Sequence, residues 1–314
     1  MTQRTTRRIV ISGNGAAWYA GFSIWLAALE SRPLKADLVC VPAGLLARGR
    51  FAWRPGDVLF AISSSGEFRD LAEAVSDAGS PPVVAVTASP GSTVARAAVA
   101  KAVVGLEGET AFTHSTAYVG NVALGLAIVA RATGDDSLAA AVADLPDSSA
   151  AAIRVAEEWP IADALGSWRP RTVLGVGDGP AWAAGLEMAL LAREVARIPG
   201  EGAELREGAT SSMFGLSPDD LALLAEVGAP DSETAQLETE TVRMLEERGT
   251  RVLRLPGGRL GDRRLAAILA FPASVRAAIH LAESAGLDPD APTTTPTYYL
   301  TARRPSEASA SSKL

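Results

Sequence analysis

Three consecutive serines follow one of the most apolar stretches of the chain and suggest an anion-binding loop. The run Val58–Ile62 is typical of a buried strand, and Ser63, Ser64 and Ser65 come next, ahead of Gly66 and a helix-compatible stretch. Hydroxyl groups and the backbone N–H groups at the start of a helix can together bind an anion. The simpler alternative is that Ser65 only caps the helix.

A second pattern recurs in both halves of the chain at a constant offset of 164 residues. Residues 13–21 are GNGAAWYAG and residues 177–185 are GDGPAWAAG. Each copy follows an apolar run and precedes a long helix-compatible stretch, an order that presents free backbone N–H groups to a ligand. We therefore predict a duplicated unit, in which Gly13, Asn14 and Gly15 contact the substrate. The alternative is that the glycines only make a tight turn, since short glycine motifs are weak evidence.

Apolar runs alternate with helix-compatible stretches along both halves, which predicts an α/β protein with parallel, helix-covered sheets. In the first half, the expected strands are Arg8–Ser12, Asp37–Val41, Asp57–Ile62, Pro82–Thr87 and Lys101–Val104, and the expected helices are Ala17–Glu30, Glu67–Ala78 and Thr116–Ala132. In the second half, the expected strands are Thr172–Val176, Leu221–Val227, Arg251–Leu255 and Ala267–Phe271, and the expected helices are Ala181–Ala196, Glu233–Glu247 and Ser274–Ala285. Turn-like residues near 145–165 lead us to expect domains over residues 1–150 and 151–303, followed by a disordered tail over 304–314.

The composition limits the chemistry that these elements can support. The chain has 29 basic residues, of which only Lys35, Lys101 and Lys313 are lysines, and none of them lies near a candidate loop. A Schiff base between protein and substrate is therefore not expected. The single cysteine, Cys40, and the two histidines exclude an intrachain disulfide and a metal site built from several histidines or cysteines. We expect neither a metal nor a cofactor.

The net charge and the lengths of the apolar runs argue against nucleic-acid and membrane partners. The net charge of −7 predicts no basic surface for nucleic acid or an anionic membrane. The runs Ala16–Leu29 and Ala117–Ala130 are too short or too interrupted to span a membrane. No secretory signal precedes the first expected strand. We therefore expect a cytoplasmic protein that acts on a small molecule.

Taken together, the segments SGNGAAWYAG, ISSSGEFRDLAEAVSDAG and LEMALLAREV resemble the sugar isomerase (SIS) domain, present twice. The resemblance covers residues 8–300 and is nearest to the isomerase half of glucosamine-6-phosphate synthase and to related sugar-phosphate isomerases and deglycases. It implies two tandem SIS domains, each a parallel sheet sandwiched by helices in a three-layer αβα arrangement of the flavodoxin or Rossmann type. It also implies a sugar or sugar phosphate as ligand, and a homodimer whose subunits share the active site.

The resemblance also implies roles for particular residues. The serine loop would bind the sugar phosphate, together with Glu67 in the same SSSGE segment. Glu194 would move a proton between C1 and C2, and Glu187 matches a further glutamate of the family. The stretch that begins at His114 matches a segment lining the sugar pocket, which adds Ser115 and Thr116 as substrate-binding candidates.

Several functional residues of the family are replaced in this chain. Glu207 stands at or beside the position of a ring-opening histidine, and Thr297 stands at the position of a substrate-binding lysine. The sequence does not decide whether Glu207, His114 or His280 takes the role of that histidine. In the phosphate site, Phe68 replaces a threonine, and a bulky ring there would crowd a phosphate.

A glutamate is the group best suited to the proton transfer that remains possible. An aldose–ketose shift needs a base that removes a proton from carbon next to a carbonyl and returns it. A glutamate whose pKa is raised by burial can do this near neutral pH. Glu194 has the apolar neighbours Leu190 and Leu191. The alternative is that Glu194 pairs with Arg193 or Arg197 on a solvated helix face.

Two classes of function fit these observations. The first is an isomerase-type enzyme that transfers a proton between C1 and C2 of a phosphosugar, an aminosugar or a modified sugar. The second is a non-catalytic sugar-binding or regulatory protein. The presence of Glu187 and Glu194 favours the enzyme, whereas loss of the histidine and the lysine favours a silent relative or an enzyme with an unusual substrate.

His114 gives the first test of the site. We predict that its imidazole supplies the acid or base for ring opening, or hydrogen-bonds oxygens of the substrate. The alternative is a histidine that merely precedes a helix. His114→Ala should lower turnover by a factor on the order of 10², measured by steady-state kinetics. Unchanged turnover and unchanged affinity would exclude the role.

Overall fold

The computed structural model describes residues 6–77, 79–105, 113, 115–229, 232–291, 294, 297, 298 and 302. In the first half, the strands are β1 (Arg8–Ser12), β2 (Asp37–Cys40), β3 (Asp57–Ile62), β4 (Val83–Thr87) and β5 (Ala100–Val103), and the helices are α1 (Ala16–Leu29), α2 (Ala43–Leu46), α3 (Arg69–Ser76), α4 (Thr93–Ala97), α5 (Ser115–Thr133) and α6 (Asp136–Ala143). In the second half, the strands are β6 (Val173–Gly177), β7 (Gly200–Glu204), β8 (Leu221–Ala225) and β9 (Arg251–Leu255), and the helices are α7 (Leu145–Glu158), α8 (Ile161–Leu165), α9 (Pro180–Glu194), α10 (Leu205–Thr210), α11 (Glu233–Glu247), α12 (Ala266–Leu269) and α13 (Phe271–Glu283).

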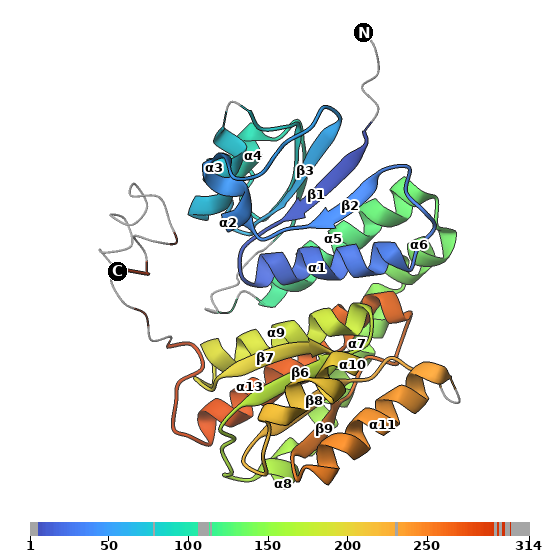
Figure 1. Cartoon of the computed structure of the whole chain (residues 1–314), viewed down its shortest axis with the longest axis vertical. Coiled ribbons are helices and arrows are strands. Elements are labelled where there is room, and N and C mark those ends of the chain that lie inside the picture. The colour runs from blue at the N-terminus through green and yellow to red at the C-terminus, as the bar shows by residue number, and fades with distance from the viewer. Residues whose placement is uncertain are drawn as a thin grey trace.

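Two parallel sheets carry the fold, one in each half. The first sheet has the order β2-β1-β3-β4-β5, and the second has the order β7-β6-β8-β9. All strand pairs are parallel, and helices flank both sheets (Figure 1). The predicted α/β class with helix-covered parallel sheets is therefore confirmed, and the shared strand order shows that the two halves are built alike.

The strand order places two of the predicted loops side by side. From β1 the chain crosses to β2 on one side, whereas β3 leads to β4 on the other side. In open parallel sheets, ligands bind where the order reverses in this way, at the carboxyl ends of the strands. The turn Gly13–Gly15 follows β1 and the loop Ser63–Ser65 follows β3, so the topology brings both to this crevice.

The glycines of the repeated turns are required by geometry. Gly15 and Gly179 both have a φ of +53°, which side-chain-bearing residues rarely adopt. In the second half, β6 and α9 also approach closely, because a Cβ on Gly175 would collide with the backbone of Gly185. Glycine therefore allows α9 to lie directly against its sheet.

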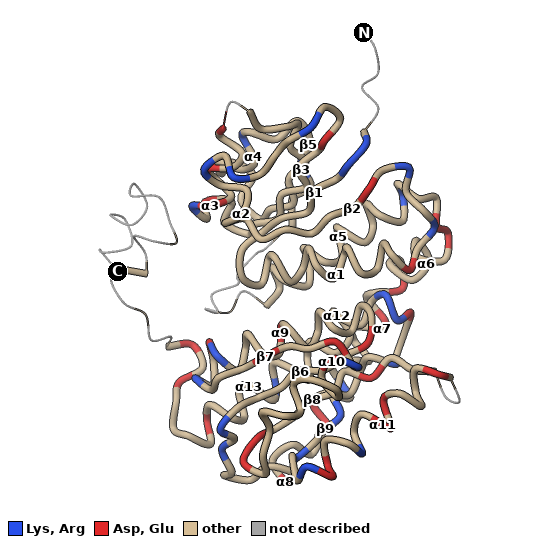
Figure 2. Tube along the Cα trace, viewed as in Figure 1, with Lys and Arg blue, Asp and Glu red and all other residues tan. Residues whose placement is uncertain are grey.

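Helices from the two halves form a shared layer between the sheets. Helices α1 and α5 pack together, and α1 also packs against α9 (Figure 1). One core cluster crosses this boundary, and it includes Tyr118 and Leu126 from the first half with Met188 and Phe271 from the second. The tubes of α1 and α5 carry almost no charged residues (Figure 2). The two halves are thus joined by a continuous apolar core.

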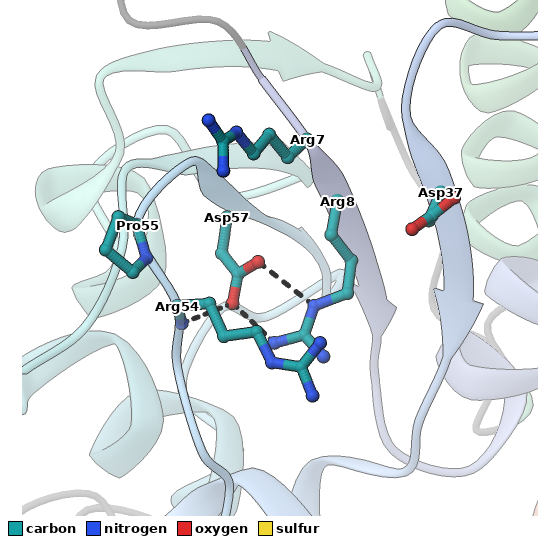
Figure 3. Close-up of a pocket in the computed structure, with 6 residues that line it drawn as sticks. All are labelled: Arg7, Arg8, Asp37, Arg54, Pro55 and Asp57. Carbon is teal, nitrogen blue, oxygen red and sulfur yellow. Dashed lines mark hydrogen bonds and ion pairs between the residues drawn. The ribbon is translucent and has the colours of Figure 1, made fainter.

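A bidentate ion pair recurs at the amino-terminal edge of each sheet. Arg8 binds Asp57 with N–O distances of 3.0 and 2.5 Å (Figure 3), and Arg171 binds Asp220 at 3.1 and 2.6 Å. Both pairs are 49 residues apart in sequence. Burial opposes ionisation of the two aspartates, but hydrogen bonds from the arginines outweigh it and lower the pKa of each. The pairs tie the first and third strand segments of each half together.

Arg264 forms a buried ion-pair network that links the halves at one end of α9. Its guanidinium lies 2.9 Å from Asp135 of the first half and 2.5 Å from Asp262 of the second, and its side chain is only 8% exposed. Next to it, Arg263 bridges Glu30 at 3.0 Å and Asp178 at 2.6 Å. The relative position of the halves is therefore fixed by charge pairing as well as by the apolar core.

Most expected strands and helices lie within one or two residues of their observed bounds, but two expectations about the second half are wrong. The predicted strand Ala267–Phe271 is helical, in α12 and the start of α13, because a short apolar run fits a fully buried helix as well as a strand. The edge strand β7 is absent from the prediction, since its sequence GEGAE lacks the β-branched and aromatic residues that favour strands.

The expected domain boundary between residues 150 and 151 falls inside α7, which packs against α13. The chain is therefore helical at that point, and the domain limits stay a prediction.

The segments Ser115–Thr133 and Arg263–Glu283 are long and apolar enough to cross a membrane by length and composition alone, and 44% and 72% of their most apolar windows are buried within the protein. The tail over 304–314 lies outside the described residues.

The network around Arg264 predicts a large loss of stability when it is broken. Arg264→Ala leaves two aspartates without their cation in a mostly buried place, and it should lower the free energy of unfolding by about 3–5 kcal/mol in urea titrations. Arg243→Ala is the matched control, because Arg243 makes only an exposed pair with Glu247 and should change stability by less than about 0.5 kcal/mol. Equal losses in both variants would contradict the role of the network.

Candidate functional site

The serine loop after β3 is organised by its own hydroxyl groups. Ser63 is buried, and its Oγ accepts a hydrogen bond of 3.0 Å from the N–H of Gly66. The Oγ of Ser65 accepts one of 3.3 Å from the N–H of Glu67. Helix α3 starts only at Arg69 and has no side-chain cap. The simple alternative, in which Ser65 serves as the helix cap, is therefore wrong.

Glu67 makes its hydrogen bonds to a different helix. Its two carboxylate oxygens accept hydrogen bonds from the backbone N–H and the hydroxyl of Thr93, at 2.6 and 2.8 Å. Thr93 begins α4, and a carboxylate is favourable at a helix N-terminus. These contacts give Glu67 a structural task, namely to hold the serine loop against α4. Its proposed contact with substrate stays a prediction.

The equivalent loop of the second half already holds an anion, and that anion is the chain's own Glu238. After β8, the backbone N–H groups of Val227 and Gly228 donate to the same carboxylate oxygen at 2.6 and 2.9 Å. Arg259 binds the other oxygen at 2.7 Å, and the Glu238 side chain is fully buried. The loop that follows β8 thus binds a carboxylate of the chain itself.

In the first half, the same two N–H groups are available. Ser64 and Ser65 occupy the second and third positions after β3, as Val227 and Gly228 do after β8. No hydrogen bond from either N–H to a described residue is present. Asn121 approaches the loop from α5, with its Nδ2 donating to Ser64 Oγ at 3.3 Å. The loop after β3 therefore presents two backbone N–H groups that the described residues leave unbonded.

The two glycine turns also differ in whether the protein itself engages their polar side chain. Asp178 in the second turn is held by Arg263 at 2.6 Å, which commits that turn to the contact between the halves. Asn14 takes the equivalent place in the first turn, and its buried Oδ1 has no hydrogen-bond partner among the described residues. The open loop and the open turn lie at the same edge of the first sheet, as their strands are neighbours.

Helix α9 brings its carboxyl-terminal end to this edge. Its first residues lie near the end of α1, because Arg263 bridges Asp178 and Glu30. Its last turn lies near the start of α1, where Arg193 donates to the hydroxyl of Tyr19 at 3.3 Å. The two helices are therefore antiparallel. Glu194, the last residue of α9, lies near the start of α1, which directly follows the turn Gly13–Gly15.

Glu187 and Glu194 lie two turns apart on one face of α9, in different surroundings. Glu187 is only 4% exposed, and burial, with the charge of Glu194, raises its pKa to about 8 against the opposing effect of Arg193. Glu194, in contrast, is an exposed residue. Its pKa is nevertheless raised, because neighbouring groups partly desolvate the carboxyl, again against Arg193. At neutral pH, Glu187 thus keeps a proton more readily than Glu194 does.

Two further polar residues belong to this group, and the sequence analysis missed both. Tyr118 and Asn121 are 2% and 1% exposed, and neither Tyr118 Oη nor Asn121 Oδ1 has a hydrogen-bond partner among the described residues. Burial raises the pKa of Tyr118, and the charge of Glu187 adds to the effect. The helix that carries them is apolar along most of its length, so two isolated polar residues were the only signal in the sequence.

Glu207 lies away from this group. It is exposed on α10, which follows β7 at the sheet edge where α9 starts. Glu194 lies at the other end of α9, about 20 Å along the helix at 1.5 Å per residue. Within one chain, the two carboxyl groups are therefore not brought together.

The remaining candidates are distributed as follows. Ser115 and Thr116 begin α5, and Thr297 is exposed in the C-terminal segment. His114 lies outside the described residues. His280 is on α13, and its Nε2 is 3.0 Å from the carbonyl oxygen of Gly166. Within the described ranges, no three His, Cys, Asp or Glu side chains are grouped to hold a metal ion.

A shallow hollow at the opposite edge of the first sheet is a separate feature (Figure 3). It is lined by Arg7, Arg8, Asp37, Arg54, Pro55 and Asp57. Arg8 and Asp57 neutralise each other there, and the hollow lies at the amino-terminal ends of the strands, whereas ligands of such sheets bind at the carboxyl ends.

The self-occupied loop of the second half gives a direct test of anion binding. Glu238→Ala removes the carboxylate from two buried N–H groups and from Arg259, and should lower the free energy of unfolding by about 2–3 kcal/mol. Inorganic phosphate should restore part of this loss by binding the folded state, as read from urea titrations with and without phosphate.

The control for this experiment is Glu240→Ala, since Glu240 makes only an exposed ion pair with Arg206. We expect a change of less than about 0.5 kcal/mol and no specific response to phosphate. If Glu238→Ala were as stable as the unchanged protein, the loop would not be an anion-binding element.

Solved structures share this fold over most of their length. Glucosamine-6-phosphate deaminase from Thermotoga maritima has a TM-score of 0.74 at 18% identity, covering 92% of this chain and 89% of that one. The C-terminal domain of glucosamine-fructose-6-phosphate aminotransferase from Francisella tularensis has a TM-score of 0.75 at 18% identity, with 91% and 87% covered. Tagatose-6-phosphate ketose/aldose isomerase from Escherichia coli has a TM-score of 0.68 at 14% identity, with 93% and 86% covered.

No protein-family model and no curated protein matches the sequence. At identities of 14–18%, the likeness to these structures concerns the backbone arrangement, and a shared fold does not by itself transmit an activity. The chain therefore has the α/β fold of these structures, with two parallel sheets whose helices meet between them.

Proposed function

We propose that this protein is a sugar-phosphate isomerase-type enzyme that moves a proton between C1 and C2 of a phosphosugar, an aminosugar or a modified sugar. The open loop Ser63–Ser65 would hold the anionic group, and Glu194 would be the base. The similar structures, which include a glucosamine-6-phosphate deaminase and a tagatose-6-phosphate isomerase, support a sugar phosphate as the ligand class.

The observation that carries the proposal is the difference between the two equivalent loops. In the second half, the two N–H groups bind the carboxylate of Glu238. In the first half, the N–H groups of Ser64 and Ser65 have the same positions after their strand and bind no described residue. Three serine hydroxyls surround them. An anion brought by a ligand is the group that would complete this loop.

The proposed proton transfer rests on the different protonation of Glu187 and Glu194 on α9. Glu194, the carboxyl group that ionises more readily, would take a proton from C2 while the carbonyl oxygen at C1 gains one. The same glutamate would return its proton to C1 while the C2 hydroxyl loses its proton to become a carbonyl. That proton replaces the one that the C1 oxygen gained, so no proton is consumed overall. Ring opening before this step is the role proposed for His114. The raised pKa of Glu194 supports its use as a base near neutral pH.

We also propose a homodimer in which the partner subunit completes the active site. Glu207, the residue at the family's histidine position, follows β7 at the sheet edge where α9 starts, whereas Glu194 lies at the other end of α9, about 20 Å along that helix. Glu207 is exposed on α10, so it would contribute to the site of a neighbouring subunit. We place the enzyme in the cytoplasm, with residues 1–150 and 151–303 as its two units.

A ligand screen by thermal unfolding tests the proposal first. The panel contains hexose phosphates, aminosugar phosphates, their unphosphorylated counterparts and other nitrogen-bearing sugars. We expect phosphorylated sugars to raise the melting temperature and their unphosphorylated counterparts to do so less. A stabilising compound is then assayed for exchange of its C2 hydrogen with solvent. Binding without exchange would leave a non-catalytic sugar-binding protein.

Glu194→Gln tests the base. The variant should bind the ligand but exchange the C2 hydrogen about 10²–10³-fold more slowly, because the amide accepts no proton. In the unchanged protein, the exchange rate should rise as the pH increases through the raised pKa of Glu194, since the base must be ionised. The assay follows loss of deuterium from C2 by NMR across the pH range.

Glu247→Gln is the matched control, because Glu247 is an exposed helical glutamate paired only with Arg243. It should exchange at the unchanged rate. If Glu194→Gln also kept the full exchange rate, Glu194 would not be the base.

A further inference from the structure

Three polar atoms, two on α5 and one on α9, are buried without hydrogen-bond partners among the described residues. They are Tyr118 Oη, Asn121 Oδ1 and Glu187 Oε2. The residues that carry them are 2%, 1% and 4% exposed. Buried polar groups in folded proteins are almost always hydrogen-bonded, so a group of three that lack partners indicates a place where a ligand supplies them.

The three residues connect the open loop with the helix of the proposed base. Tyr118 and Asn121 lie one turn apart on the same face of α5. Asn121 reaches the loop through its Nδ2, which donates to Ser64 Oγ at 3.3 Å. Tyr118 is close enough to Glu187 for the charge of the carboxyl to act on the phenol. From Glu187, two turns of α9 lead to Glu194.

The chemistry of these atoms specifies the complementary group. An amide oxygen and an ionised carboxylate only accept hydrogen bonds, and a phenol oxygen can also accept one. An ammonium group donates three hydrogen bonds, whereas a hydroxyl donates one. A buried carboxylate, moreover, is stable only next to a positive charge. The set therefore matches an ammonium group better than a hydroxyl.

The charged groups described around Glu187 do not supply a cation that forms an ion pair with its carboxylate. On its own helix, Arg193 opposes the effect of Glu194, but the Arg193 guanidinium is engaged by the carbonyl of Gly200 at 2.6 Å. From α13, His280 contacts the carbonyl oxygen of Gly166. Arg276 is the other basic residue of α13. Its buried Nε has no hydrogen-bond partner among the described residues, and Arg276 is not among the groups that shift the pKa of Glu187.

From α1, the hydroxyl of Tyr19 lies near Arg193, and Glu30 is bound by Arg263 at the far end of α9. From η3 (Arg263–Leu265), Arg264 is bound by two aspartates. Of these cations, Arg193 is the one that acts on the pKa of Glu187, so a cation that pairs with Glu187 would come from the ligand.

Building on the proposed function, we propose that Tyr118, Asn121 and Glu187 form a subsite for a protonated amine of the sugar phosphate. The phosphate would occupy the loop Ser63–Ser65, and the amine would lie between α5 and α9. The subsite would distinguish an aminosugar phosphate from its hydroxyl analogue.

Occupation of the subsite has a measurable consequence for protons. With its pKa raised to about 8, Glu187 carries a proton at pH 6.5. An arriving ammonium group favours the ionised form of Glu187. The carboxyl group therefore loses its proton to the buffer, and the resulting carboxylate forms an ion pair with the ammonium group. The N–H protons of the ammonium stay on nitrogen.

Isothermal titration calorimetry at pH 6.5 measures this proton. The probes are glucosamine 6-phosphate and its hydroxyl analogue glucose 6-phosphate, each titrated in buffers that differ in ionisation enthalpy. The slope of binding enthalpy against ionisation enthalpy counts the protons released. Because both probes carry the same phosphate, the difference between their slopes reports the amine alone. We expect glucosamine 6-phosphate to bind at least tenfold more tightly and to release close to one additional proton.

Variants assign the effect to the subsite. Glu187→Gln, which has nearly the same shape, should lose the additional proton and most of the tenfold preference for glucosamine 6-phosphate over glucose 6-phosphate. Tyr118→Phe should weaken the preference severalfold and leave the proton count unchanged. Glu247→Gln is the matched control, because Glu247 is exposed, and it should behave as the unchanged protein.

The outcomes separate this inference from the function on which it rests. If both probes bind equally and release equal numbers of protons, or if glucose 6-phosphate binds more tightly, the amine subsite is wrong while the sugar-phosphate site stands. If the amine preference survives unchanged in Glu187→Gln, the subsite lies elsewhere. If neither probe binds the unchanged protein, the sugar-phosphate function itself fails, and the subsite fails with it.

Discussion

The antiparallel contact between α9 and α1 is the constraint on which the candidate site depends. Each helix starts at the carboxyl edge of its own sheet, so a parallel arrangement would bring the two loop edges to the same end of the molecule. The antiparallel arrangement instead brings the end of α9, with Glu194, to the edge where β1 and β3 finish. The apolar core between the halves and the ion pairs of Arg264 keep this arrangement fixed. The proposed site therefore combines a residue of the second half with loops of the first.

The two halves share the same backbone arrangement, but the side chains at corresponding loops make different contacts. Both halves have the same strand order and the same clamp between an arginine and an aspartate. In the second half, however, Glu238 fills the anion-binding loop and Asp178 commits the glycine turn to an ion pair with Arg263. In the first half, serines and Asn14 take the corresponding places and leave backbone groups available. In the second copy these positions thus make contacts within the protein, whereas in the first copy the corresponding backbone groups are unbonded among the described residues.

Local features of this protein were predictable from sequence, and features that depend on distant partners were not. The serine loop, the repeated turn and the spacing of Glu187 and Glu194 are short-range patterns, and their elements formed as expected. The network in which Glu238 takes the place of a ligand could not be predicted, because it depends on which helix packs over which loop. The clamps could have been found, since an arginine and an aspartate recur 49 residues apart in both halves. An apolar run such as Ala267–Phe271, in contrast, fits a buried helix and a strand equally well.

A buried carboxyl oxygen without a hydrogen-bond partner destabilises a fold, and Oε2 of Glu187 has none among the described residues. Folding would favour an apolar residue in place of Glu187, because burial, together with the charge of Glu194, raises its pKa to about 8. The surrounding structure offsets that penalty with a continuous core and with charge networks that are fully paired at the other end of α9. Elsewhere in the described chain, buried acids such as Glu238 and Asp220 are matched with cations. An acid that departs from this practice, next to an unpartnered tyrosine and asparagine, is placed where function and not stability determines the residue.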